Sequence, residues 1–229
     1  MKLTILLTLF LVSQSYAGTL RIGVVDSGLD LTDSRLNGHL CATGHKDFTG
    51  EGLKDINGHG TEMTGLIEKY AGKGDYCLVI YKYYSDSDPG IVNSKHEAEA
   101  LDVAVKDGIK IINLSSSGPD FEEKEYLIIR ENPDVTFVVA AGNDYKNLDI
   151  PGEVAYPASY RLKNETVVGN VDGESNRVPS SNYSKKITVV EMGKDVYTTF
   201  INGYGYITGT SASCAVHTGK MIKEMLNAK

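Results

Sequence analysis

LRIGVVDSG, residues 20–28, joins a short apolar run to an acidic residue and a glycine turn. A run of this length, rich in β-branched residues, predicts a strand that is buried on both faces, as strands of parallel sheets are. Further short segments rich in β-branched or aromatic residues also predict strands, at 77–84, 109–114, 135–140, 166–171 and 187–190. The first segment therefore predicts one strand of a parallel sheet, with an acid at its carboxyl end.

Helical patterns separate these strands. One helix is expected to have Ser94 as its cap and to end before Gly108, with apolar residues at Ala98, Leu101, Ala104 and Val105. Others are predicted at 62–70, at 120–131 and from Gly209 toward Lys229. Strands alternating with helices predict a single three-layer α/β domain with a mainly parallel sheet flanked by helices.

Length and composition exclude several classes of protein. The 229 residues include 41% hydrophobic and 23% charged residues, 24 Gly and 6 Pro, which argues against collagen-like, disordered and multi-span membrane chains. The formal charge of −7 argues against binding to nucleic acid or to an anionic membrane. Three cysteines are too few for a disulfide scaffold and lack the spacing of a structural zinc site.

The first 17 residues have the pattern of a secretory signal peptide. Lys2 precedes an apolar run over 3–12, and small residues stand at Ser15 and Ala17 around the expected cleavage point. The run is too short to span a membrane. A buried strand or helix is the alternative. We expect a mature domain over 18–229 that is secreted or periplasmic, with no propeptide between the signal and the first strand.

Three short motifs contain an acid, a histidine and a serine at turns. They are VVDSG at 24–28, NGHGT at 57–61 and GTSAS at 209–213. Taken alone, Asp26 is an ordinary turn residue, His59 a structural histidine and Ser211 a helix cap. Taken together they offer what nucleophilic catalysis by serine needs: a nucleophile, a base, and a carboxylate that orients the base. A fourth motif, AAGN at 140–143, adds an amide donor, Asn143, for a developing oxyanion.

With these motifs the chain resembles the subtilisin-like serine proteases. The order acid, histidine, serine is that of subtilisin, and the likeness extends through NLSSSGP at 113–119 and YPA at 156–158. The resemblance implies that Asp26, His59 and Ser211 form the catalytic triad and that Asn143 lines the oxyanion hole. It also implies a mainly parallel sheet flanked by helices, in agreement with the pattern of strands and helices.

The resemblance also implies a peptide-binding cleft. One wall is an edge segment that pairs with an extended substrate. The other wall contacts the side chain of the substrate residue that precedes the scissile bond. The implied substrate-binding residues are Ser115, Ser116 and Ser117 on the first wall, Ala141 and Gly142 on the second, and Ala155 at the floor. Without the triad, the serines are better explained as a polar turn. The small floor at Ala155 implies room for a large neutral side chain, whereas Ser117, which replaces a glycine that is usual in the family, is expected to narrow the entrance.

The chain also departs from the family pattern. Ala212 and Ala215 replace the usual Met and Pro after the serine, and Glu62 replaces a second histidine. Only six residues, 71–76, separate the helix after His59 from the next strand, so the family's calcium-binding insertion has no room. We therefore expect no metal and no cofactor.

The family's strand arrangement implies a disulfide between Cys41 and Cys77, each at the beginning of one of two neighbouring strands. Cys214 is then a buried thiol. Three free buried cysteines are the alternative.

The function expected from the sequence is an exported, calcium-independent serine endopeptidase that forms an acyl-enzyme at Ser211. We expect a monomer that acts on peptide or protein substrates, with control left to location, narrow specificity or a separate inhibitor. The alternative is an inactive subtilisin-fold protein that binds peptides or a partner. An esterase of the nucleophile-elbow type is excluded, because no G-x-S-x-G surrounds Ser211 and the chain order differs.

Overall fold

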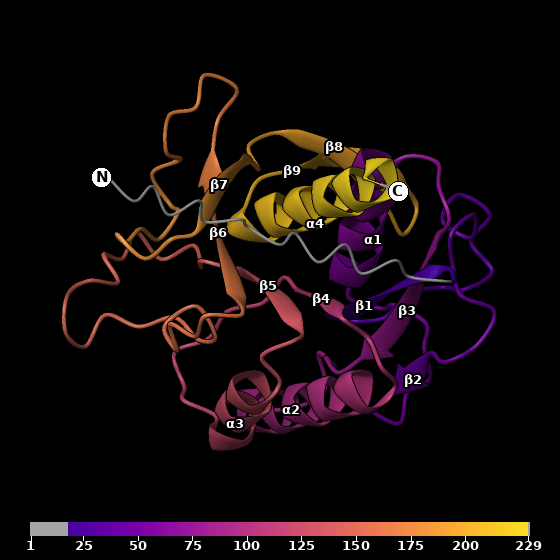
Figure 1. Cartoon of the computed structure of the whole chain (residues 1–229), viewed down its shortest axis with the longest axis horizontal. Helices are drawn as coiled ribbons and strands as arrows, with labels where there is room; N and C mark the ends of the chain where they lie inside the picture. Colours follow the sequence, from indigo (N-terminus) through magenta and orange to yellow (C-terminus); the bar gives the residue numbers. More distant parts are fainter. Residues whose placement is uncertain (1–17, 229) are drawn as a thin grey trace, which may run out of the picture.

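A parallel sheet of seven strands lies at the centre of the computed structural model, which describes residues 18–228 (Figure 1). The predicted signal peptide, 1–17, lies outside the described residues. The strands are ordered β2-β3-β1-β4-β5-β6-β7, and β8 and β9 form a separate hairpin. In chain order the elements are β1 (Leu20–Asp26), β2 (Lys46–Asp47), α1 (His59–Ala71), β3 (Tyr76–Lys82), α2 (Gly90–Lys106), β4 (Ile111–Leu114), α3 (Glu123–Glu131), β5 (Thr136–Ala140), β6 (Glu165–Val171), β7 (Val189–Met192), β8 (Val196–Phe200), β9 (Gly203–Ile207) and α4 (Thr210–Asn227).

The central strand β1 is buried along almost its whole length. Six of its seven residues are buried, and only Arg21 reaches solvent. Because side chains alternate between the two faces of a strand, Ile22 and Val24 pack into the hydrophobic cluster on one face of the sheet and Val25 into the cluster on the other. A strand with apolar contacts on both faces must be covered by helices on both.

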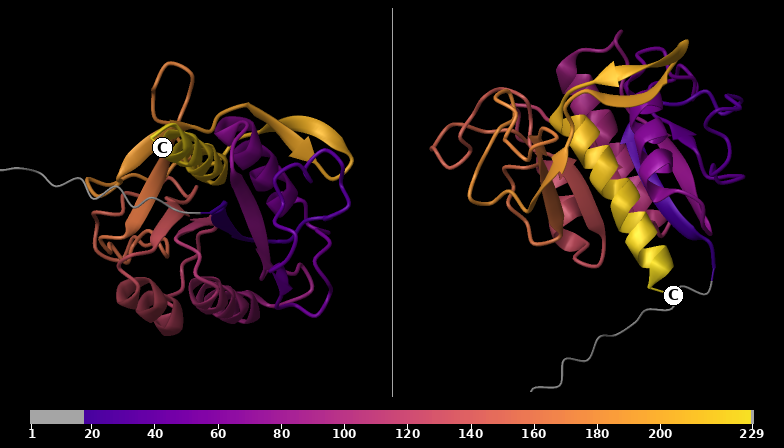
Figure 2. Two further views of the ribbon diagram at one scale, coloured as in Figure 1. Left: turned by 45° about the vertical axis from the view of Figure 1, so that its right-hand side comes forward. Right: turned by 90° about the horizontal axis from the view of Figure 1, so that it is seen from above.

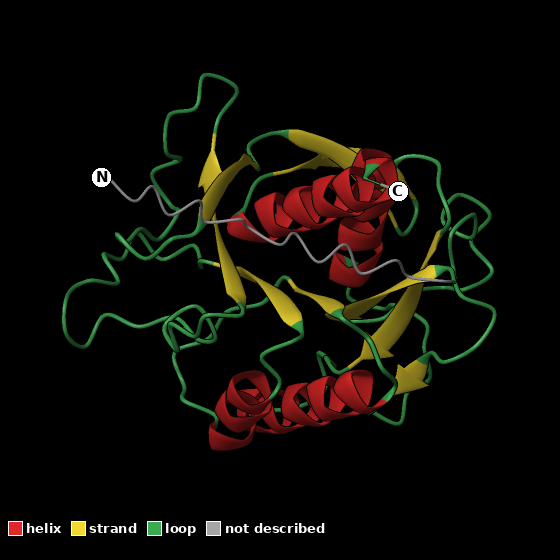
Figure 3. Cartoon of the chain, in the orientation of Figure 1, coloured by secondary structure: helices red, strands yellow, loops and turns green. Residues whose placement is uncertain are grey.

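The helices form one layer on each side of the sheet. Helices α1 and α4 cover one face, and α2 and α3 cover the other (Figure 1 and Figure 3). This arrangement confirms the predicted three-layer α/β class. Helix α4 lies close on α1 at Gly219, where a Cβ atom would lie 2.7 Å from the carbonyl oxygen of Ile67. None of the described helices is both long enough and apolar enough to cross a membrane.

The sheet topology gathers the loops that carry the polar motifs. Strand β1 pairs in parallel with β3 on one side and with β4 on the other, and β4 pairs in parallel with β5. Chain order therefore reverses at β1, and in open α/β sheets binding sites lie beyond the carboxyl ends of the strands at such a reversal. Asp26, Ser115 and Asn143 all stand at this edge, at the ends of or just after β1, β4 and β5.

The hairpin of β8 and β9 was not among the predicted strands. Its strands are antiparallel, and exposed tyrosines alternate with glycines along β9. A sequence of this kind lacks the continuous apolar run by which the other strands were recognised. The hairpin projects beyond the end of α1 in the right-hand view of Figure 2, and the Thr198 hydroxyl donates a 2.7 Å hydrogen bond to the carbonyl oxygen of Glu62 on that helix.

Three predicted helix starts were wrong. Helix α1 begins at His59, and not at Glu62. Helix α2 begins at Gly90, after Pro89, and not at Ser94; the Ser94 hydroxyl instead donates back to the carbonyl oxygen of Gly90. Proline holds the backbone in a conformation suited to a helix start, so a helix begins there without a serine cap. Helix α3 begins at Glu123, where the Glu122 carboxylate accepts from the backbone N–H of Lys124, and not at Asp120.

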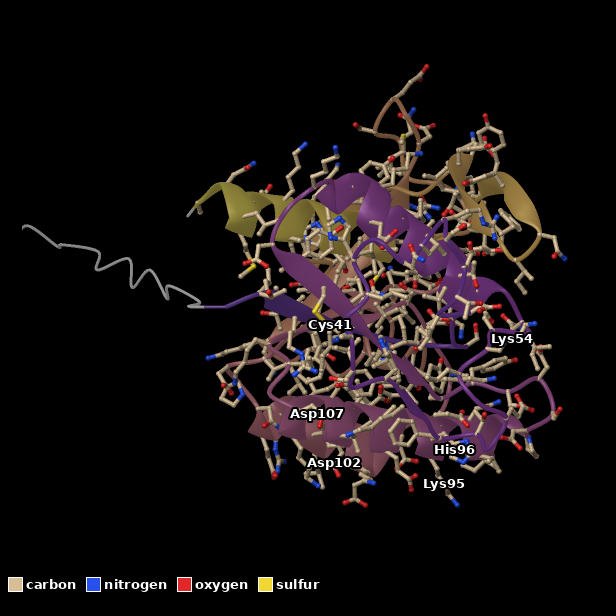
Figure 4. The ribbon with its side chains drawn as sticks, turned by 90° about the vertical axis from the view of Figure 1, so that its right-hand side faces the viewer. Cys41, Lys54, Lys95, His96, Asp102 and Asp107 are labelled. Carbon is tan, nitrogen blue, oxygen red and sulfur yellow. A yellow bond between two sulfur atoms is a disulfide. The ribbon has the colours of Figure 1, made fainter. Side chains whose placement is uncertain are left out.

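A disulfide joins Cys41 to Cys77 (Figure 4). Cys77 lies in β3 as expected, whereas Cys41 does not begin a strand; it follows an isolated bridge between Leu40 and Leu78. The Cys41 backbone N–H donates a 3.0 Å hydrogen bond to the carbonyl oxygen of Leu78, and this bond aligns the segment beside β3 without forming a continuous strand. Cys214 on α4 is a free, fully buried thiol.

The bridge closes a loop over a sequence separation of 36 residues. Chain-entropy arguments then predict that replacing both cysteines by serine lowers the free energy of unfolding by about 4 kcal/mol, because the unfolded chain regains freedom. Denaturant titration of the wild type and the double variant measures this loss. The native wild type should expose no reactive thiol and release one on denaturation; three thiols after denaturation without reductant would contradict the pairing.

Candidate active site

A buried aspartate and a half-buried histidine form the centre of the candidate site. Asp26 ends β1 and is 4% exposed, and His59 is the first residue of α1. The Nδ1 atom of His59 lies 2.8 Å from Oδ1 of Asp26, an oxygen that also accepts a 2.7 Å hydrogen bond from the backbone N–H of Ser27. The side chain of His59 keeps 34% of its surface exposed. The Asp26 carboxylate therefore holds Nδ1 of the imidazole, and Nε2 remains as the ring nitrogen that can accept a proton.

The surroundings of His59 favour its charged form. Burial alone would lower the pKa of His59, but the charge of Asp26 and their hydrogen bond outweigh burial, with smaller contributions from Glu62 and Asp55. Together they raise the pKa of His59 to about 9. Glu62, one turn along α1, is itself partly buried, and burial raises the pKa of its carboxyl. The imidazole is thus a stronger base than a free histidine.

Asp55, a residue that the sequence analysis did not select, fixes the start of α1. It is 3% exposed, and its carboxylate accepts four hydrogen bonds of 2.7–2.9 Å: from the Ser27 hydroxyl, the Gly58 N–H, and the Thr61 N–H and hydroxyl. The helix cap, Gly58, has no side chain to satisfy these donors. Asp55 therefore acts as a remote cap.

The first turn of α1 is also held against the end of β1. The Gly60 N–H donates a 2.9 Å hydrogen bond to the hydroxyl of Ser27. A Cβ atom on Gly60 would lie 2.3 Å from the carbonyl oxygen of Gly28, so no larger residue fits there without movement. These contacts place His59 directly beside Asp26.

Ser211 is the second residue of α4, and three hydrogen bonds tie this helix start to the loops after β4 and β5. The Ser115 hydroxyl donates to the carbonyl oxygen of Ser211 at 3.2 Å. The Thr210 N–H donates to Oδ1 of Asn143 at 2.9 Å, and the Gly142 N–H donates to the Thr210 hydroxyl at 3.1 Å. Because its Oδ1 is engaged in this way, Asn143 has its amide NH₂ group available for another acceptor.

A cavity of about 340 Å³ brings the predicted catalytic residues together. Asp26, His59, Asn143 and Ser211 all line it. The remaining lining residues are Ser27, Asn57, Tyr83, Tyr84, Ser115, Ser116 and Ser117. The four residues come from two strand ends and two helix starts, and the fold places them around one cavity.

The residues predicted for the second wall and the floor of the cleft do not line this cavity. They are Ala141, Gly142 and Ala155, and all three are buried. A Cβ atom on Gly142 would lie 3.1 Å from the Ser117 hydroxyl oxygen and 3.2 Å from the Cβ of Ala155. The Ser117 side chain therefore reaches across toward Gly142 and narrows the space between the two walls.

Sequence reasoning missed Ser27 and Asp55, and it also missed Tyr83 and Tyr84 in the cavity wall. Both tyrosines directly follow β3, which ends at Lys82, whereas the predicted strand ran to residue 84 and so included them. Asp55 lies three residues before the glycine cap of α1, which was a weak signal. Within residues 18–228 there is no group of three or more His, Cys, Asp or Glu side chains placed to hold a metal ion.

Comparison with solved structures places the fold among subtilisin-like proteinases. A lanthipeptide protease superimposes with a TM-score of 0.77 at 22% identity, covering 91% of this chain and 73% of the other. A cold-adapted subtilisin-like serine proteinase superimposes with a TM-score of 0.77 at 21% identity, covering 92% and 76%. These similarities establish a shared fold.

The chain belongs to the subtilase family of serine peptidases, because the family model matches residues 18–223. The major intracellular serine protease of Bacillus subtilis is 29% identical over 219 residues, which cover 88% of this chain and 67% of the relative. Subtilisin Savinase of Lederbergia lenta is 28% identical over 203 residues, covering 83% and 70%. The chain spans only 16% of subtilisin-like protease 2 of Plasmodium falciparum, to which it is 26% identical.

Replacing Asp55 by alanine should strongly destabilise the protein. The change leaves the buried donors of Ser27, Gly58 and Thr61 without their acceptor, and bonds to a charged group are worth about 1.5–3 kcal/mol each. We expect the free energy of unfolding to fall by at least about 3 kcal/mol, measured by denaturant titration. Asp134→Ala, which removes an exposed carboxylate, is the control and should lower the free energy of unfolding far less than Asp55→Ala does. Equal losses in the two variants would contradict the capping role.

Proposed function

We propose that this subtilase is an exported endopeptidase that hydrolyses peptide bonds through an acyl-enzyme at Ser211. The observation that carries the proposal is the Asp26–His59 pair, 2.8 Å apart, lining one cavity with Ser211 and Asn143. Serine alone is a weak nucleophile, and a base oriented by a buried carboxylate is what activates it. Membership in a family of serine peptidases supports the same chemistry.

In the proposed reaction the Ser211 hydroxyl oxygen attacks the carbonyl carbon of the scissile bond. Nε2 of His59 takes the hydroxyl proton, while Asp26 holds Nδ1 and stabilises the imidazolium. The amide of Asn143 and the backbone N–H of Ser211, at the start of α4, donate to the oxyanion. His59 then gives its proton to the leaving amine, and the carbon–nitrogen bond breaks. Water, deprotonated by His59, then attacks the ester carbon. The bond to the Ser211 oxygen breaks, this oxygen takes the proton back from His59, and the acid product leaves.

The substrate binds in this proposal as an extended strand along Ser115–Gly118. Its side chain before the scissile bond then faces the narrow space between Ser117 and Gly142. Ala141 and Ala155 support that space from behind as buried residues. A small or slender side chain fits this geometry better than a bulky one.

Export is the second part of the proposal. It is supported by the signal-like pattern of residues 1–17 and by the disulfide between Cys41 and Cys77, because such bonds persist in oxidising compartments. Two relatives are named as intracellular proteases, of Bacillus subtilis and of Paenibacillus polymyxa. In the oxidising compartment we propose a monomer acting on peptides or unfolded proteins.

Covalent labelling tests the nucleophile. A fluorophosphonate should modify the wild type at Ser211, and Ser211→Ala should lose both labelling and peptide hydrolysis. Asn143→Ala should keep the nucleophile but lose about 10²–10³-fold in kcat, as is typical when one oxyanion donor is removed. Ser34→Ala, which changes an exposed serine on a loop, is the control and should behave as wild type. Peptide binding by the wild type without labelling would instead support an inactive peptide-binding protein.

The raised pKa of His59, about 9, predicts an alkaline pH profile. Only the neutral imidazole accepts the serine proton, so kcat/KM should rise about tenfold per pH unit below pH 9 and level off above it. Asp26→Asn removes the charge that contributes most to raising the pKa of His59. The residual kcat/KM of this variant should be far lower than that of the wild type, and its pH midpoint should lie at a lower pH. Asp134→Asn should leave the midpoint unchanged. A wild-type midpoint near 6.5 that does not move in Asp26→Asn would contradict the assignment.

A further inference from the structure

A second cavity adjoins the catalytic one. It has a volume of about 190 Å³, and it shares Tyr83, Tyr84, Ser116 and Ser117 with the wall of the cavity that contains His59 and Ser211. A single water needs only about 10–15 Å³, so this space is large enough for a side chain. Its position along Ser115–Gly118 puts it beside the path of the extended substrate proposed above.

A buried glutamate and a partly buried glutamate, from two different helices, line this second cavity. Glu97 comes from α2, and Glu125, 4% exposed, comes from α3. The Ser116 hydroxyl donates to Oε1 of Glu97. The Tyr160 hydroxyl donates to Oε2 of Glu125 at 2.7 Å, whereas Oε1 of Glu125 is buried without any hydrogen-bond partner among the described residues. A buried acceptor without a donor is costly.

The charge around these two carboxyls is uncompensated. Burial raises the pKa of Glu97 to about 7. Burial, followed by the charge of Glu97, raises the pKa of Glu125 well above its ordinary value. Asp120 and Glu122 also line the cavity, and none of its lining residues is a lysine, arginine or histidine. Lys95, on the same helix as Glu97, points away from the body of the molecule (Figure 4).

We propose that this acidic cavity binds the side chain of a lysine or arginine in the substrate, on the acyl side of the scissile bond. An ammonium or guanidinium group supplies a positive charge for both carboxyls and an N–H donor for the unpartnered Oε1 of Glu125. The substrate class is then a peptide with a basic residue upstream of the cut. This inference rests on the proposed function for its substrate, but the cavity itself can be tested without catalysis.

Alternation along the edge segment indicates which substrate residue enters. The Ser116 side chain points to Glu97, whereas the Ser117 hydroxyl approaches Gly142 on the other side. Paired strands share their faces, so the residue before the scissile bond faces the Ser117 side and residues an odd number of positions upstream face the Ser116 side. The cavity extends along the segment from Ser116 to Gly118, Pro119 and Asp120. In this pairing the residue before the scissile bond is placed opposite Ser115, and the residue opposite Gly118 is then three positions upstream of it. We assign the side chain of that upstream residue to the cavity.

The test uses fluorescent peptides in which one arginine is moved through the acyl side, with norleucine at the other positions. Binding is measured by anisotropy on the full chain carrying Ser211→Ala, where hydrolysis cannot occur. The arginine peptide should bind about 10- to 100-fold more tightly than the all-norleucine peptide when arginine stands three positions upstream of the residue before the bond. Hydrolysis by the wild type is followed in parallel.

The carboxyls are tested by Glu97→Gln combined with Glu125→Gln. In this double variant the affinities for the arginine peptide and the all-norleucine peptide should differ by no more than about twofold. Unchanged binding of the norleucine peptide shows that the cleft is still folded. Glu123→Gln, which removes one charge from an exposed position on α3, should keep the full preference.

Equal binding of the arginine and norleucine peptides, or a preference that survives in the double variant, would overturn the assignment. Arginine preference without hydrolysis or labelling of the wild type would support the cavity and refute the proposed peptidase. Hydrolysis without a preference for arginine would support the proposed peptidase and refute the assignment of the cavity.

Discussion

The parallel alignment of β1, β4 and β5 is the constraint on which the candidate site depends. Because the three strands run the same way, their carboxyl ends meet at one edge and bring Asp26, Ser115 and Asn143 together. Helices α1 and α4 begin at the same edge, with His59 and Ser211 in their first turns. An antiparallel neighbour in place of β4 would send its loop to the opposite edge. The close contact of α4 with α1 at Gly219 then fixes the two helix starts relative to each other.

Three buried carboxyl groups near the carboxyl ends of the strands differ in how fully their oxygens are hydrogen-bonded. Asp55 receives four hydrogen bonds and has a purely architectural role as the cap of α1. Asp26 is paired with His59 and so raises the basicity of that imidazole. Glu125 has one satisfied oxygen and one without a donor. The number of hydrogen bonds that each carboxyl accepts thus matches its role. Asp55 supports the fold, Asp26 raises the basicity of His59, and Glu125 can accept a hydrogen bond from a ligand.

Local sequence was sufficient for most of the sheet. The predicted strands at 20–25, 77–84 and 135–140 match β1, β3 and β5 to within two residues at each end. Buried parallel strands are recognisable because both faces are apolar, which leaves a continuous run in the sequence. The β8–β9 hairpin was not predicted because three of the five residues of β8 are buried and none of β9 is. The start of α2 was misplaced because Ser94 is a common helix-capping residue, whereas the helix begins after Pro89.

The sequence by itself determined the fold class and the family, through the apolar strands and the four motifs around Asp26, His59, Asn143 and Ser211. Those motifs are local, and the backbone turns they encode require particular residues. Tertiary structure decided what surrounds them. Asp55 is a cap only because the loop before α1 folds back onto Ser27, and Glu97 meets Glu125 only because α2 and α3 lie side by side beneath the sheet (Figure 1). Contacts between residues far apart in the chain depend on how whole elements pack, and no local pattern of residues records that packing.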